Sequence, residues 1–166
     1  MDPFRVPTSG VATATVGAVE TISRSDGPDD GPWSIRLSRT GAAEVVEHAR
    51  RGMPDEACGL LAGAGDCVEV VYCTANADAS PVSYRVDSRD QWAAMRDAEA
   101  RGLEMLGGFH SHTRSDAYPS PTDVAQASYP EWAYLVVGLR DRPPVMRAFR
   151  ILAGEITEIP VHVDPE

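Results

Sequence analysis

Two apolar segments joined by a short turn give the strongest constraint on the fold. Residues 56–63 (EACGLLAG) and 67–74 (CVEVVYCT) each have the length and apolar content of a strand. The residues between them, Ala64-Gly65-Asp66, are typical of a tight turn. The pattern predicts a β-hairpin, so at least part of the sheet is antiparallel.

Helical and strand patterns alternate unevenly in the rest of the chain. Ser38 can cap a helix that ends near Arg51, and Ser88 with Gln91 forms a candidate capping box for a second helix, to Arg101. A short helix is predicted over 121–127, and further strands over 33–37, 84–86, 103–112, 132–139, 145–152 and 155–163. The uneven order predicts an α/β (α+β) domain with a mixed β-sheet flanked by helices, and not a regular doubly wound repeat.

The first 32 residues differ in composition from the rest. They are rich in Pro, Gly, Ser and Thr and include the acidic run 26–30. We expect a disordered extension over 1–32, in which 11–20 could add an edge strand, and one folded domain over 33–166.

Charge and cysteine content limit the function classes. The net charge of −10 disfavours nucleic acid and anionic membranes as partners, because both require a basic surface. No apolar run reaches transmembrane length, and residues 11–19 are too polar for a secretory signal. The three cysteines, Cys58, Cys67 and Cys73, form no C-x-x-C motif, so they are expected to be small buried hydrophobic residues in a reducing cytoplasm, and not disulfide partners or zinc ligands.

The segment 110–123 (HSHTRSDAYPSPTD) carries a candidate metal site. Side chains two residues apart on a strand point to the same face, so His110 and His112 project together. The loop 113–119 is long enough to bring Asp123 back as a third ligand. Three protein ligands leave a fourth position for water, which is typical of catalytic zinc sites.

Some of these residues also have simpler interpretations. Ser120-Pro121-Thr122-Asp123 fits an N-terminal capping box with proline at the first helical position, and capping does not exclude metal binding. Glu56 is the best candidate for the proton acceptor of a hydrolytic site. Its alternative is an exposed acid at a strand edge, and composition does not place it near the histidines. His48 and His162 are predicted to be solvated.

Glu56, His110-Ser111-His112, Ser120 and Asp123 together resemble the complete motif of the JAMM (MPN-plus) metallopeptidases, including the H-x-H-x(7)-S-x(2)-D spacing. The similarity is greatest to bacterial members that act on sulfur carriers, and it extends over about residues 33–163. It is carried also by the segments 54–59 (PDEACG), 74–77 (TANA), 84–88 (YRVDS) and 117–120 (AYPS).

The resemblance implies a cytidine-deaminase-like MPN domain with one zinc ion held by His110, His112 and Asp123. It implies that Glu56 deprotonates the water and that Ser120 stabilises the oxyanion. The implied substrate is a ubiquitin-like sulfur-carrier protein with a C-terminal Gly-Gly, cleaved after the second glycine. The product is then either free cysteine, as part of cysteine biosynthesis, or a carrier trimmed of extra residues.

Other readings predict different properties. A non-catalytic MPN interaction module would contain no metal. A zinc nucleoside deaminase would need H-x-E and P-C-x-x-C motifs, which the chain lacks. A cysteine peptidase using Cys58 is disfavoured because this residue lies inside an apolar strand. The oligomeric state stays open, with a homodimer as one alternative.

Overall fold

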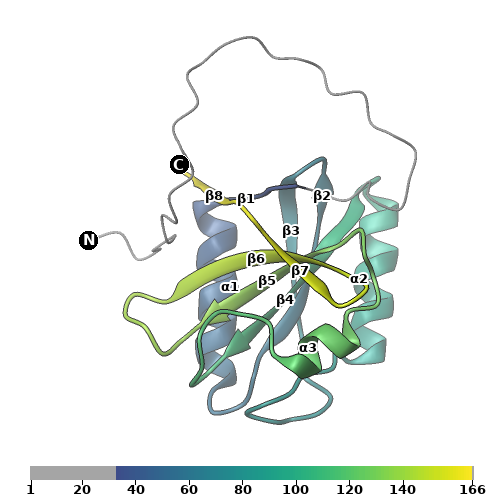
Figure 1. Ribbon diagram of the computed structural model, residues 1–166. Coiled ribbons are helices and arrows are strands. Elements are labelled where there is room, and N and C mark those ends of the chain that lie inside the picture. The colour runs from purple at the N-terminus through teal and green to yellow at the C-terminus, as the bar shows by residue number, and fades with distance from the viewer. Residues whose placement is uncertain (1–32, 166) are drawn as a thin grey trace, which may run out of the picture.

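One eight-stranded mixed sheet organises residues 33–165, which are the residues that the computed structural model describes (Figure 1). The predictions for residues 1–32 lie outside this range. The strand order is β7-β6-β5-β4-β2-β3-β1-β8. The elements in chain order are β1 (Ile35–Ser38), α1 (Arg39–Gly52), β2 (Cys58–Ala64), β3 (Cys67–Thr74), α2 (Ser88–Ala100), β4 (Glu104–His112), α3 (Pro121–Gln126), β5 (Ala133–Gly138), β6 (Val145–Leu152), β7 (Glu155–Ile159) and β8 (Val161–Asp164).

The predicted hairpin and mixed sheet are confirmed. β2 pairs antiparallel with both β3 and β4, whereas β4 pairs parallel with β5. The β4 strand therefore lies in the middle of the sheet, and its last residues, His110 to His112, are buried. A central strand is held by ladders on both sides, which makes it a rigid support for functional side chains.

The helices cover opposite faces of the sheet. α1 begins after Ser38, whose hydroxyl accepts the Gly41 N–H at 3.0 Å, as the sequence predicts. Its inner residues share a core with Phe109, whereas Ala94 of α2 packs in another cluster with Leu60. The candidate site thus belongs to a sheet that is shielded from both sides.

The capping box predicted for the second helix is wrong by one residue. Asp87, not Ser88, caps α2, and its carboxylate accepts the N–H groups of Arg89 and Asp90 at 2.9 and 3.2 Å. A carboxylate at this position also interacts favourably with the positive end of the helix dipole.

Two strand predictions also change. The segment 155–163 is not one strand, because Pro160 has no N–H and separates β7 from β8. β8 pairs parallel with β1, at the opposite edge of the sheet from β7. Because only Pro160 separates these two edge strands in the chain, the sheet must curl so that its edges approach each other. The strand predicted at 84–86 is reduced to one bridge, between Asn76 and Val86.

Among residues 33–165 there is no helix with the length and apolar character needed to span a membrane.

Candidate metal and catalytic site

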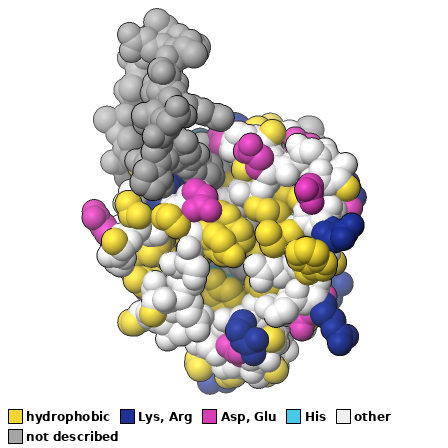
Figure 2. All heavy atoms as spheres, turned by 90° about the vertical axis from the view of Figure 1, so that its right-hand side faces the viewer, with side chains coloured by type: hydrophobic (Ala, Val, Ile, Leu, Met, Phe, Trp, Pro, Cys, Tyr) yellow, Lys and Arg dark blue, Asp and Glu magenta, His cyan; other side chains and the backbone are white. Residues whose placement is uncertain are grey.

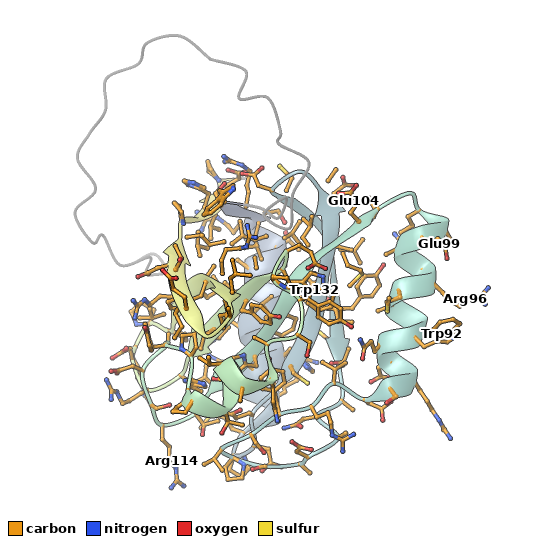
Figure 3. The ribbon with its side chains drawn as sticks, turned by 45° about the vertical axis from the view of Figure 1, so that its right-hand side comes forward. Trp92, Arg96, Glu99, Glu104, Arg114 and Trp132 are labelled. Carbon is orange, nitrogen blue, oxygen red and sulfur yellow. The ribbon has the colours of Figure 1, made fainter. Side chains whose placement is uncertain are left out.

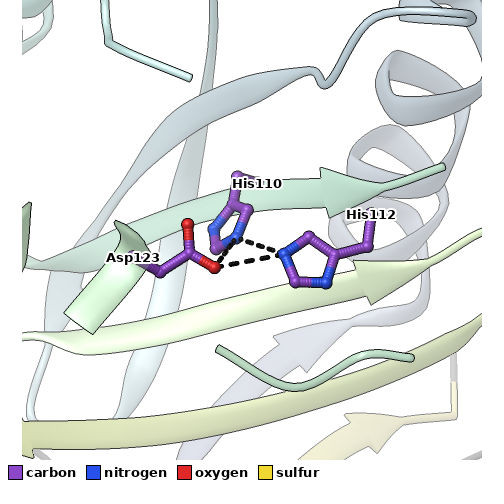
Figure 4. A group of neighbouring side chains, drawn as sticks. All are labelled: His110, His112 and Asp123. Carbon is purple, nitrogen blue, oxygen red and sulfur yellow. Dashed lines mark hydrogen bonds and ion pairs between the residues drawn. The ribbon is translucent and has the colours of Figure 1, made fainter. Parts of the chain in front are cut away.

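The strand β4 presents His110 and His112 on one face at its carboxyl end, as the alternation of side chains predicts. Both side chains are buried, with 2% and 4% of their surface exposed. Their Nε2 atoms lie 3.1 Å apart, and each lies 3.1 Å from Oδ2 of Asp123 (Figure 4). The structure therefore brings these three predicted ligands together.

The start of α3 holds the Asp123 carboxylate in this position. Ser120 caps the helix: its hydroxyl accepts the Asp123 N–H at 3.1 Å, and its own N–H donates to Asp123 Oδ2 at 2.7 Å. The capping box is thus confirmed, and the oxygen that closes it is the same oxygen that faces the two histidines. The capping box of α3 therefore fixes the position of Asp123, the third candidate ligand.

The protonation of the three groups suits a cation. The His112 Nδ1 atom lies 2.7 Å from the Asp116 carbonyl oxygen, which can only accept, so Nδ1 carries a proton, and Nε2 faces Asp123. Burial acts to lower the pKa of His112, but the hydrogen bonds to Asp123 and to the Asp116 carbonyl outweigh it and raise the pKa, so a cation at Nε2 would take the place of a proton. Burial lowers the pKa of His110, which keeps this imidazole neutral. The pKa of Asp123 is lowered. Burial acts to raise it, but hydrogen bonding to the two histidines and to the Ser120 N–H outweighs burial and keeps the carboxylate ionised.

The size of the triangle matches a zinc ion. Tetrahedral zinc with bonds of about 2.0–2.1 Å to nitrogen and oxygen requires ligand atoms about 3.3 Å apart. The observed separations of 3.1 Å are close to this value. These residues therefore fit a divalent metal with three protein ligands, the donor set of catalytic zinc sites.

Glu56 lies at the same site, which the sequence alone did not establish. Cys58 pairs with His110, and Ala57 is hydrogen-bonded to Ser111, so the chain just before β2 runs along the end of β4. Glu56 precedes Ala57, and its carboxyl is close enough to His112 and Asp123 to interact with their charges. The side chain is 6% exposed, so the alternative of an exposed strand-edge acid is wrong. Burial raises the pKa of Glu56 to about 7. Its Oε2 atom is buried and has no hydrogen-bond partner within residues 33–165. A carboxyl of this kind is suited to exchange protons near neutral pH.

Other candidate residues have structural roles or no contact with the site. His48 is not solvated as predicted, since its Nε2 lies 3.0 and 3.2 Å from the carbonyl oxygens of Cys58 and Thr74 and donates between the strands. His162 is exposed, as predicted. Burial raises the pKa of the Cys58 thiol to about 11, which disfavours a nucleophilic thiolate. The prediction of buried cysteines is confirmed for Cys58 but wrong for Cys67 and Cys73, which are exposed on β3.

Two contacts of the site were not predicted from the sequence. The ring of Tyr84 stacks on the His110 imidazole, with centroids 4.2 Å apart, and the Asn76 side chain bonds the backbone of Glu56 at 2.9 Å. Both residues lie in segments, 74–77 and 84–88, that resemble the JAMM family, but the sequence assigned them no role at the site. No spacing rule connects them to the histidines.

Comparison with known proteins gives the family. Residues 39–152 match the family described as prokaryotic homologs of the JAB domain. This chain belongs to that family. It is therefore a JAMM-type hydrolase of peptide or isopeptide bonds, and neither a nucleoside deaminase nor a non-catalytic module.

The relatives include proteins named as peptidases. The chain is 45% identical over 125 residues to the CysO-cysteine peptidase of Mycobacterium tuberculosis, covering 72% of this chain and 84% of the relative. It is 34% identical over 140 residues to the desampylase of Haloferax volcanii, covering 79% and 99%. The solution structure of DSY2949 from Desulfitobacterium hafniense superposes with a TM-score of 0.74 at 38% identity, covering 80% and 94%. The JAB1/MPN domain protein AF2198 from Archaeoglobus fulgidus shares the fold, with a TM-score of 0.54 at 17% identity, covering 79% and 97%.

Proposed function

We propose that this protein is a zinc peptidase that hydrolyses the amide bond after the C-terminal Gly-Gly of a ubiquitin-like sulfur-carrier protein and releases cysteine. The observation that carries the proposal is the triangle of His110, His112 and Asp123 with the buried carboxyl of Glu56 beside it. The similarity to a CysO-cysteine peptidase supports the substrate. A carrier with a longer tail is the second candidate, supported by the similarity to a desampylase.

Each residue has a defined task in this reaction. His110, His112 and Asp123 would hold the zinc ion, which would supply Lewis-acid chemistry: a polarised scissile carbonyl and a lowered pKa for the attacking water. Glu56 accepts the proton of this water and passes it to the leaving amine. The Ser120 hydroxyl accepts from the Asp123 N–H, so its own hydrogen can donate to the developing oxyanion.

A tail that ends in Gly-Gly offers little side-chain surface, so much of the binding energy must come from the folded body of the carrier. An apolar groove of about 460 Å³ lies beside α2, on the face of the molecule that Figure 2 shows. Trp92 and Met95 of α2 are exposed at this groove, and Met105 of β4 also lines it. In Figure 3, Trp92 and Arg96 project from the outer side of the helix, where a docking partner could reach them.

The distance from this groove to the site suits an extended tail. Met105 and His110 lie on the same strand, five residues apart, which corresponds to roughly 16 Å. About five extended residues span that length. A carrier body in the groove could therefore place its final glycine at the metal site.

The groove can be tested with Met95→Asp. A charge in the apolar groove should raise the KM for a whole carrier ending in Gly-Gly-Cys by about tenfold, because a central apolar contact is lost and a carboxylate is desolvated. The kcat value and the cleavage of a short peptide with the same tail should not change. Ala43→Asp, on the exposed surface of α1, is the matched control and should behave like the wild type. An equal KM for the carrier in all three proteins would remove the groove from substrate binding.

The full test of the function uses the zinc-loaded protein and mass spectrometry of the products. Candidate carriers ending in Gly-Gly-Cys and in longer tails are compared, and we expect cleavage after the second glycine with release of cysteine. Cleavage of only the longer tails would favour the trimming reaction. Equal kcat/KM for the free tail peptide and the whole carrier would contradict recognition of a ubiquitin-like body.

Ser120→Ala separates the two tasks of this side chain. Its hydroxyl caps α3, so the variant should lose about 1 kcal/mol of stability. Loss of the oxyanion donor should in addition lower kcat by about a hundredfold. Ser38→Ala removes the same type of cap from α1 and is the matched control: it should lower the melting temperature but not kcat. Equal kcat for Ser120→Ala and Ser38→Ala would reduce Ser120 to a helix cap.

A further inference from the structure

The Asn76 side chain uses all of its hydrogen-bonding capacity, with three bonds inside the loop 76–86 and one to the backbone of Glu56. Its Nδ2 group donates to the carbonyl oxygens of Glu56 at 2.9 Å and Ser83 at 3.0 Å. Its Oδ1 atom accepts the N–H groups of Asp78 at 3.0 Å and Arg85 at 3.1 Å. An amide has two N–H donors and two acceptor lone pairs, so all four positions are filled. An aspartate would lose both donors, and an alanine would lose all four bonds.

These bonds hold Glu56 at a point where no strand ladder does. Glu56 precedes the first residue of β2 by two positions. Its N–H donates to the Ser80 carbonyl oxygen at 2.8 Å, and its own carbonyl accepts from Asn76. The next residue, Ala57, is bound to Ser111 between the two histidines, through Ser111 Oγ at 2.8 Å and the Ser111 N–H at 2.9 Å. The loop 76–86 therefore completes the support of Glu56 on the side away from β4.

The same amide fixes the residue that covers His110. Ser83 and Arg85, whose backbone groups bond Asn76, flank Tyr84 in the chain. The Tyr84 ring stacks on the His110 imidazole, with centroids 4.2 Å apart and an interplanar angle of 17°. Asn76 thus contacts Glu56 directly, and it acts on His110 through the backbone on either side of Tyr84 and the Tyr84 ring.

We propose that Asn76 is a positioning residue that keeps the Glu56 carboxyl and the His110 ring in register, the latter through Tyr84. The inference rests on the proposed roles of Glu56 as proton acceptor and His110 as metal ligand. A displacement of about 1 Å in a reacting group can cost a hundredfold in rate, so a support that holds both groups affects the chemical step. Residues that orient metal ligands typically affect metal affinity by 10- to 100-fold.

Asn76→Ala should lower kcat by about 10- to 100-fold on a short peptide substrate and leave KM within about threefold, because positioning and not binding is lost. Asp78→Ala is the matched control in the same loop. It removes the exposed contacts of the Asp78 carboxylate to Ser83 and Arg85 but none of the four Asn76 bonds, so it should retain wild-type kcat. Wild-type kcat in Asn76→Ala would overturn the proposal.

The Tyr84 step is tested without reference to activity. Competition with a chromophoric chelator measures zinc affinity in Tyr84→Leu, which loses the stacked ring, and in Tyr84→Phe, which keeps it. We expect about a tenfold weaker affinity for Tyr84→Leu and rescue by Tyr84→Phe. Equal affinities in the two variants would overturn the connection to His110. If circular dichroism shows that Asn76→Ala does not fold, Asn76→Asp takes its place, because it loses the two donors to Glu56 and Ser83 and keeps the two acceptor positions; wild-type kcat in Asn76→Asp would overturn the proposal.

The failure of this inference is distinguishable from failure of the proposed function. If Glu56→Gln is inactive while Asn76→Ala and Tyr84→Leu match the wild type, only the positioning roles are wrong. If Glu56→Gln retains normal turnover, the role of Glu56 itself is wrong, and with it the basis of the Asn76 proposal.

Discussion

Glu56→Gln should lose at least about a hundredfold in kcat while it still binds zinc. The amide has nearly the shape of the carboxylate but cannot accept a proton, and general base catalysis commonly contributes at least this factor. Zinc content and kcat are measured on the same preparation, because a variant that lost the metal would be inactive for another reason. Near-normal kcat in the zinc-loaded variant would exclude Glu56 as the proton acceptor.

The buried position of Glu56 adds a stability test in the metal-free protein. Burial raises the pKa of Glu56 to about 7, above the ordinary value of 4.5. The folded state therefore binds the proton more tightly than the unfolded state, and its stability falls as the pH rises from about 4.5 to 7. Since Gln stays neutral, Glu56→Gln should melt higher than the wild type above pH 7, with the difference vanishing near pH 4.5. The same difference at both pH values would contradict the raised pKa.

His110→Ala and His112→Ala should each empty the metal site. The wild type should hold about one zinc per chain, and removing one of three protein ligands leaves too few to retain it. Metal analysis after dialysis gives the occupancy, and addition of zinc should raise the melting temperature of the wild type but not of the variants. His162→Ala is the control, because this histidine is exposed and far along the chain in β8. Full zinc occupancy in both site variants would disprove the ligand assignment.

Features that depend on local periodicity could be predicted from the sequence. The two-residue repeat of a strand places His110 and His112 on one face, whatever the strand pairs with. The cap at Ser120 depends on residues only three positions apart, and the resulting hydrogen bonds are present as predicted. The hairpin of β2 and β3 follows from its turn, and the family motif connects these local signals to one site.

Features that depend on register between distant segments required the tertiary structure. Glu56 lies beside His112 only because β2 pairs with β4 in one particular register, and a shift of one residue would turn its side chain to the other face. The break at Pro160 could be suspected from the sequence, but the transfer of β8 to the β1 edge could not, since it depends on the curl of the whole sheet. The contacts of Asn76 with Glu56 and of Tyr84 with His110 cross 20 and 26 residues of chain, and no periodicity relates such positions. The sequence by itself thus determined which side chains can bind a metal, because that depends on spacing within one strand and one helix turn. Only the tertiary structure decided which further carboxyl lies beside them and what holds it there, because those are consequences of strand register and loop packing.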